Sequence, residues 1–166
     1  MSYFLFGSFN STYDEELAEN VKIYANNKNI YFWFGKELTF YKDIQRMFEE
    51  QKSEGNIQFA ITSKNQPRNS SDVLFPFDKY ESNLLFEDES REFYKRCCRE
   101  NIDILFDCLK KMIDIFRIKQ VDIFVVEGYD DVFTHKICSI DELKQDLLCQ
   151  IEDKVSIDSH VYKILC

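Results

Sequence analysis

An α+β or α/β domain, with a mixed β-sheet of about six strands and packed helices, is predicted by three features of the sequence. The 166-residue chain is 45% hydrophobic, which is enough for a single domain over residues 1–166 with its own core. Apolar segments of strand length alternate with longer segments of helical period. Gly (4) and Pro (2) are scarce and aromatic residues reach 16%, so a well-ordered chain is expected.

The N-terminal part of the chain predicts two strands separated by a helix. Ser2–Ser8 carries apolar side chains on both faces, as a buried strand does. Thr12 and Glu15 have the spacing of a capping box, and apolar residues follow at helical spacing, so a helix is expected over Tyr13–Asn26. Ile30–Phe34 is the strongest strand signal in the chain.

The next segment predicts a helix, a strand and a loop. One apolar side over Lys42–Glu54 indicates a helix that Gly55 is expected to cap. Alternation over Ile57–Ile61 predicts a third strand. The Ser-, Asn- and Pro-containing stretch Thr62–Asp72 is expected to be a loop, and Val73–Phe77 a short edge strand, because its proline cannot donate a ladder hydrogen bond.

A long helix is predicted near residues 89–117, within Glu89–Lys119. Its apolar side chains form one stripe at helical spacing. The stripe is expected to pack on the sheet through Leu105, Leu109, Met112 and Phe116.

The C-terminal part predicts a hairpin followed by a helix and a last strand. Val121–Val126 and Asp131–Ile137 flank a short Gly-containing segment, which is typical of a β-hairpin. Ser139 and Glu142 form a second capping box, so a helix is expected to follow. Ile157–Leu165 supplies the last expected strand. The strand order is not predicted.

The charge is distributed unevenly. The chain has 30 acidic and 21 basic side chains, a net charge of -9. Residues 120–166 include ten acidic and four basic side chains, whereas residues 89–119 include eight basic and six acidic ones. Such asymmetry favours an acidic surface that meets a basic partner. The sequence pI near 4.8 disfavours nucleic-acid binding, because phosphate contacts need clustered Lys and Arg.

Residues that could carry catalysis or bind metal are few. The two histidines, His135 and His160, both lie in expected strands and are interpreted as strand-face residues. His135 and Cys138 make only one pair of potential metal ligands, and at this spacing in a strand they point to opposite faces. The six cysteines have no paired spacing and are interpreted as free thiols. No metal, cofactor or catalytic residue is therefore predicted.

The strongest candidate for a partner-binding surface is the turn after Val126. Glu127, Asp130 and Asp131 place three carboxylates around Tyr129. The simpler interpretation is a solvated turn. The alternative is a contact patch in which the carboxylates pair with Arg or Lys of a partner while the tyrosine supplies an aromatic anchor.

The N-terminal segment has no basic leader, and nowhere do about 18 apolar residues follow one another. A cytoplasmic protein that does not interact with membranes is expected.

The small, acidic, cysteine-containing and aromatic-rich chain, which ends in Ser159-His-Val-Tyr-Lys-Ile164, resembles the immunity proteins of bacterial polymorphic or contact-dependent growth-inhibition toxins. The resemblance implies a non-enzymatic protein that binds the C-terminal domain of a cognate toxin and blocks its active site. Such toxins are often cationic nucleases, which would account for the acidic surface. The family implies no shared catalytic residues.

Two other classes of protein remain open at this point. One is a structural or regulatory protein-interaction domain, and the other is an enzyme with an unrecognised site. A gene directly downstream of a toxin C-terminal region would favour the immunity protein, whereas a pocket lined by convergent polar residues would favour the enzyme.

Overall fold

The computed structural model describes the chain except for residues 1–2, 39–41, 64, 66–87, 128–132 and 155–157. The described elements, in chain order, are β1 (Tyr3–Phe9), α1 (Glu15–Asn26), β2 (Tyr31–Phe34), the 3-10 helix η1 (Gly35–Leu38), α2 (Lys42–Glu50), β3 (Ile57–Thr62), α3 (Asp88–Phe116), β4 (Gln120–Glu127), β5 (Thr134–Cys138), α4 (Ile140–Lys154) and β6 (His160–Leu165). The mixed α+β class, the six strands and the long helix are thus as predicted. The expected edge strand Val73–Phe77 lies outside the described residues.

The six strands form one sheet in the order β2-β3-β1-β4-β6-β5. All neighbours are antiparallel except β5 and β6, which are parallel. The predicted hairpin between β4 and β5 is therefore wrong, because β6 lies between these two strands. Val121–Val126 is buried throughout and needs a neighbour on each side, whereas β5 is half exposed and suits the edge of the sheet.

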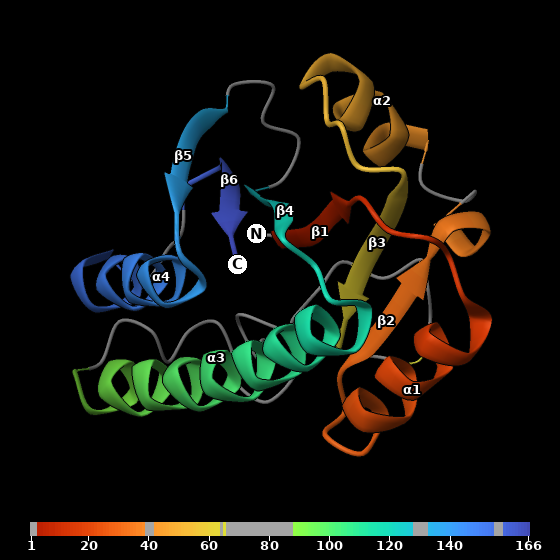
Figure 1. The fold of residues 1–166 in the computed structure, drawn as a ribbon. Coiled ribbons are helices and arrows are strands. Elements are labelled where there is room, and N and C mark those ends of the chain that lie inside the picture. Colours follow the sequence, from red (N-terminus) through yellow and green to blue (C-terminus); the bar gives the residue numbers. More distant parts are fainter. Residues whose placement is uncertain (1–2, 39–41, 64, 66–87, 128–132, 155–157) are drawn as a thin grey trace.

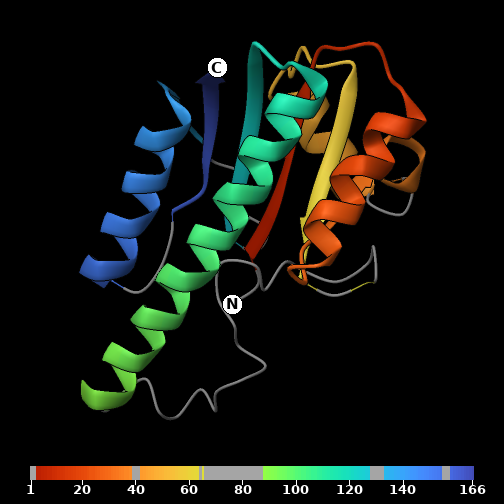
Figure 2. The same ribbon diagram turned by 60° about the horizontal axis from the view of Figure 1, so that its bottom comes forward.

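Helices cover the sheet unequally. In Figure 1, α1, α3 and α4 lie below the sheet and α2 lies above it. Figure 2 shows α3 running diagonally across the strands between α4 and α1. The side under these three helices holds the larger apolar cluster, and the α2 side holds a smaller one around Phe6, Phe48 and Phe124. The long helix buries the predicted stripe of Leu105, Leu109, Met112 and Phe116.

Helix starts depart from the sequence pattern in one of two cases. Asp14 caps α1, with its side chain accepting from the backbone N–H of Glu16 at 2.8 Å. The predicted capping box of Thr12 and Glu15 is wrong because the closer carboxylate takes that role. At α4, the Ser139 N–H donates to Glu142 at 2.7 Å and the reciprocal bond is 3.2 Å, so this predicted box is confirmed.

Three helices are followed, within three residues, by a residue in the left-handed region that is not glycine. These residues are Asn29 after α1, Lys52 after α2 and Arg117 after α3, with φ of 58°, 52° and 52°. Each is followed by a residue whose N–H bonds back into the last helical turn, as Ser53 does to the Phe48 carbonyl at 3.0 Å. The expected helix to Glu54 with a Gly55 cap is therefore wrong, because α2 ends four residues earlier.

Candidate functional site

Of the four residues predicted to bind a partner, only Glu127 lies within the described part of the chain. It is the last residue of β4 and lies opposite Tyr3 of β1 in the sheet register. Tyr129, Asp130 and Asp131 lie outside the described residues.

The uneven charge of the sequence is partly balanced inside the molecule, between α3 and α4. Lys110 of α3 pairs with Asp141 of α4 at 2.7 Å, and Lys144 of α4 pairs with Asp103 of α3 at 2.6 Å. Towards the other end of α4, Glu152 pairs with Arg99 and, at 3.5 Å, with a lysine of α3. Part of the acidity of 120–166 therefore serves packing of the basic helix against α4.

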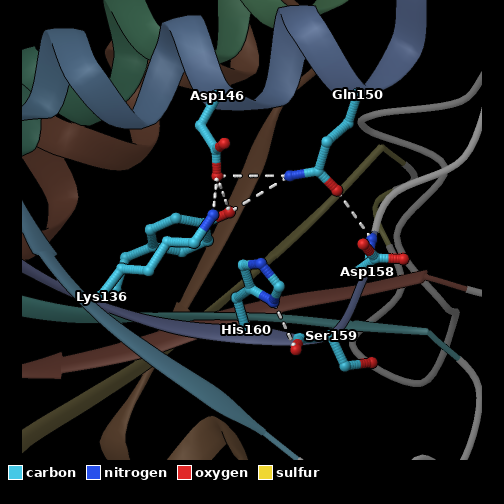
Figure 3. A network of polar contacts seen from close by, with 7 residues as sticks. Lys136, Asp146, Gln150, Asp158, Ser159 and His160 are labelled. Atoms are coloured by element: carbon cyan, nitrogen blue, oxygen red, sulfur yellow. Dashed lines mark hydrogen bonds and ion pairs between the residues drawn. The ribbon is translucent and has the colours of Figure 1, made fainter. Parts of the chain in front are cut away.

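A polar network joins α4 to the two strands that it covers. Asp146 Oδ2 accepts hydrogen bonds from Tyr162 at 2.6 Å and Lys136 at 2.8 Å (Figure 3). Gln150 donates to the same oxygen at 3.3 Å, and its own Oε1 accepts from the Asp158 N–H at 2.9 Å. The network thus ties β5, α4 and β6 together.

The protonation of this network follows from its contacts. Burial raises the pKa of Asp146, but the hydrogen bonds from Lys136 and Tyr162 outweigh it and hold that pKa below its ordinary value. Burial, together with the bond to Asp146, raises the pKa of Tyr162. His160 is buried nearby with Nδ1 2.6 Å from the Ser159 carbonyl oxygen. A carboxylate with several donors and a tyrosine that stays protonated make a stable structural link.

A second polar cluster lies on the opposite side of the sheet, which α2 covers. Gln58, Ser8, Asp122 and Lys163 follow one another across β3, β1, β4 and β6, each opposite the next in register. We call these four residues the polar row. It borders the apolar cluster under α2, since the next register positions towards that cluster include Phe6 and Phe124.

Asp122 is the most deeply buried charged residue of the polar row. Only 9% of its surface is exposed, and Oδ2 receives one long hydrogen bond, 3.4 Å, from Ser53. Ser53 is also hydrogen-bonded to Ser8. Oδ1 is buried and has no hydrogen-bond partner. Burial raises the pKa of Asp122, although Lys163 and Ser53 act in the opposite direction. The carboxylate is therefore held in a costly environment.

A cleft of about 400 Å³ is lined in part by Asp122, at the end of the two central strands where β1 finishes and β4 begins. Its lining, mainly polar, consists of Ser8, Phe9, Asn10, Glu54, Gly55, Arg117, Lys119, Gln120 and Asp122. Gly55 is required here because a β-carbon would lie 2.4 Å from the backbone nitrogen of Phe9 and from Ser8 Oγ. Asp122 also borders a smaller cavity of about 170 Å³ next to His135 and Lys163.

In the described residues, the serines next to Asp122 do not form a catalytic group with a histidine. His135 Nε2 lies 2.9 Å from Gln51 Oε1, and the hydrogen bonds of Ser53 run to Asp122 and Ser8. Within the described ranges, no three His, Cys, Asp or Glu side chains come together as metal ligands. Burial raises the pKa of the Cys98 thiol to about 12, so this cysteine is inert as a nucleophile.

Asp122 was not singled out from the sequence, although a signal was present. It is the one charged residue within the apolar run Val121–Val126. A carboxylate in a continuously buried strand is rare unless it is paired.

In comparisons with protein-family models, with curated proteins and with solved structures, no match to this chain was found. Among the helices that the structure describes, none combines the length and apolar character needed to cross a bilayer.

Proposed function

We propose that this protein is a non-enzymatic binding protein of the immunity type, which neutralises a cognate toxin domain in the cytoplasm through an acidic surface. The partner would be a basic protein, such as a cationic nuclease domain. No cofactor or metal is required for this role.

The observation that carries the proposal is the surplus of carboxylates in 120–166, where ten acidic residues accompany four basic ones. Two of those bases, Lys136 and Lys144, are already held in ion pairs with Asp146 and Asp103. Asp153 of α4 is exposed and makes no ion pair in the described part of the chain. An uncompensated acidic surface raises the association rate with a cationic partner.

The proposed contact patch is the segment from Glu127 to Asp131. Its three carboxylates would pair with Lys or Arg of the partner, and Tyr129 would act as the aromatic anchor. In the chain, the segment follows the central strand β4 and precedes the edge strand β5.

The test begins with a partner captured by co-purification from the native source, and its association rate is then measured at two salt concentrations. The double variant Asp130→Lys and Asp131→Lys should slow association and flatten its salt dependence, because exposed charges are screened over about 8 Å at physiological salt. Co-expression with the captured partner should show weaker protection of growth.

Glu49→Lys with Glu100→Lys is the matched control, since it changes the net charge equally at two exposed positions on α2 and α3. It should bind faster than the Asp130 and Asp131 variant. Equal rates for the two variants would assign the effect to net charge alone and remove the patch. A captured partner that does not harm cells would overturn the immunity role itself.

A further inference from the structure

Strand β5 leaves one edge of the sheet open. It is the last strand in the order β2-β3-β1-β4-β6-β5 and, among the described residues, it pairs only with β6 (Figure 1). Every second residue of an edge strand directs its backbone N–H and C=O groups away from the sheet. These groups fit a further strand, so the occupant that suits this edge is an extended segment.

The α2 side of this edge carries exposed apolar side chains. Ile137 of β5 is 72% exposed and Leu165 of β6 is 55% exposed. Ile137 lies opposite Lys163 in register, and Leu165 follows two residues later, so both apolar side chains are on the same side of the sheet. An apolar residue on an added strand would pack against Ile137 and remove it from water.

The α4 side of the same edge has a surplus of carboxylates. Lys136 of β5 points to this side and pairs with Asp146 at 2.8 Å. Cys138 lies two residues further along β5, and its pKa is raised by burial and by the nearby carboxylates of Glu142 and Asp146. Glu142 is exposed. A cationic side chain placed opposite Cys138 on an added strand would therefore meet negative charge.

Strand β5 itself has the side chains that this edge requires. Two copies can pair antiparallel about a twofold axis only with one residue opposite itself, because opposed residues lie on the same side of the sheet. With Ile137 on the axis, the two isoleucines meet, and Lys136 of each copy lies opposite Cys138 of the other. Centring the pair on His135 or Lys136 would place two basic side chains against each other, which is unfavourable.

We propose that the protein forms a twofold dimer in which the β5 strands of two copies pair antiparallel around Ile137 and join the two sheets. The net charge of -9 on each copy opposes association, and two five-residue strands bury little area. The dissociation constant should therefore lie between about 1 μM and 1 mM and fall as salt screens the repulsion. The dimer surface consists of other residues than the contact patch from Glu127 to Asp131.

Analytical ultracentrifugation of the full chain over a concentration series measures this equilibrium. Ile137→Lys should weaken dimerisation at least about tenfold, because it places two ammonium groups on the axis. Ile23→Lys makes the same change at another exposed isoleucine, on α1, and should dimerise at least as well as the parent protein. A chain that stays monomeric at about 1 mM, or an equal loss in both variants, would overturn the dimer.

Ile137→Cys tests the register. Under mild oxidation, the two thiols on the axis should form a disulfide and give a covalent dimer on a non-reducing gel. Ile23→Cys is the matched control, because the chain already has the exposed cysteines Cys149 and Cys166. Cross-linking of Ile137→Cys no faster than that of the control would remove Ile137 from the axis. A monomeric chain whose β5 amides are protected from hydrogen exchange only by a captured partner would assign the edge to that partner and overturn the dimer.

Discussion

Asp146, on the side of the sheet that α3 and α4 cover, is partly buried, and Asp122, on the side that α2 covers, is buried. The two carboxylates differ in their hydrogen-bond partners. Asp146 receives bonds from a lysine, a tyrosine and a glutamine, all to Oδ2. Asp122 receives one long bond, and its other oxygen has no partner. The pKa of Asp146 is accordingly lowered and that of Asp122 raised.

The difference teaches how to separate stabilising from destabilising buried carboxylates in one molecule. A carboxylate with enough donors stabilises the fold and needs nothing further. A buried carboxylate with too few donors reduces stability instead. Three expected outcomes test this contrast.

The largest effect is expected at Asp146. Asp146→Ala should lower the free energy of unfolding by about 2 kcal/mol, because it leaves Lys136 and Tyr162 without their acceptor. Urea unfolding at neutral pH measures this. Asp153→Ala, an exposed change on the same helix, should stay within about 0.5 kcal/mol of the parent protein. A loss at Asp146 no greater than that of the control would mean that the network does not hold α4 to the strands.

An intermediate effect of opposite sign is expected at Asp122. Asp122→Asn should raise the free energy of unfolding at neutral pH by about 1 kcal/mol, because a charge without sufficient donors is removed from a buried position. The pKa of Asp122 is raised in the folded protein, so its charge destabilises the fold above that pKa and has no effect below its ordinary value of 3.8. The gain from the variant should therefore grow as pH rises from about 4.

Asp146→Asn should show the opposite dependence of stability on pH. Urea unfolding of both variants and the parent protein over a series of pH values measures this. The folded pKa of Asp146 is lowered, so its contribution to stability is present above the ordinary value of 3.8 and is lost as pH falls below it. The two variants should thus diverge in opposite directions above about pH 4 and converge on the parent protein in stronger acid. Parallel curves would show that both carboxylates are equally well solvated.

Much of the fold could be predicted because the elements are local. Patterns of period two and of helical period located the described strands and helices. The capping box at Ser139 and Glu142 marked the start of α4. Strand pairing could not be predicted, because the segment after Glu127 looks like a hairpin turn, whereas the sheet inserts β6 between β4 and β5. The strand order depends on β4 pairing with one strand on each side, β1 and β6, and this is a tertiary property.

The candidate sites were less accessible from the sequence. The acidic surplus was interpreted as a partner surface, but only spatial neighbours show that Asp141 and Glu152 meet the basic residues of α3. Asp122 could have been flagged as a charge inside an apolar strand. Its missing hydrogen-bond partner and the adjacent cleft come from three segments far apart in the chain, so no local pattern contains them.

The smallest effect is expected at Lys52, which places the Ser53 hydroxyl beside Asp122. Lys52 has a φ of 52°, a left-handed conformation that glycine adopts without strain. Lys52→Gly should raise the free energy of unfolding by about 0.5 kcal/mol, because relief of this strain exceeds the extra flexibility of the unfolded chain. Lys52→Ala keeps the β-carbon and should gain nothing, which separates backbone strain from loss of the lysine charge. Because the Ser53 N–H still bonds to the Phe48 carbonyl, Lys52→Gly should keep the pH profile that Asp122 imposes, and a flattened profile would show that the lysine side chain itself sets the environment of Asp122.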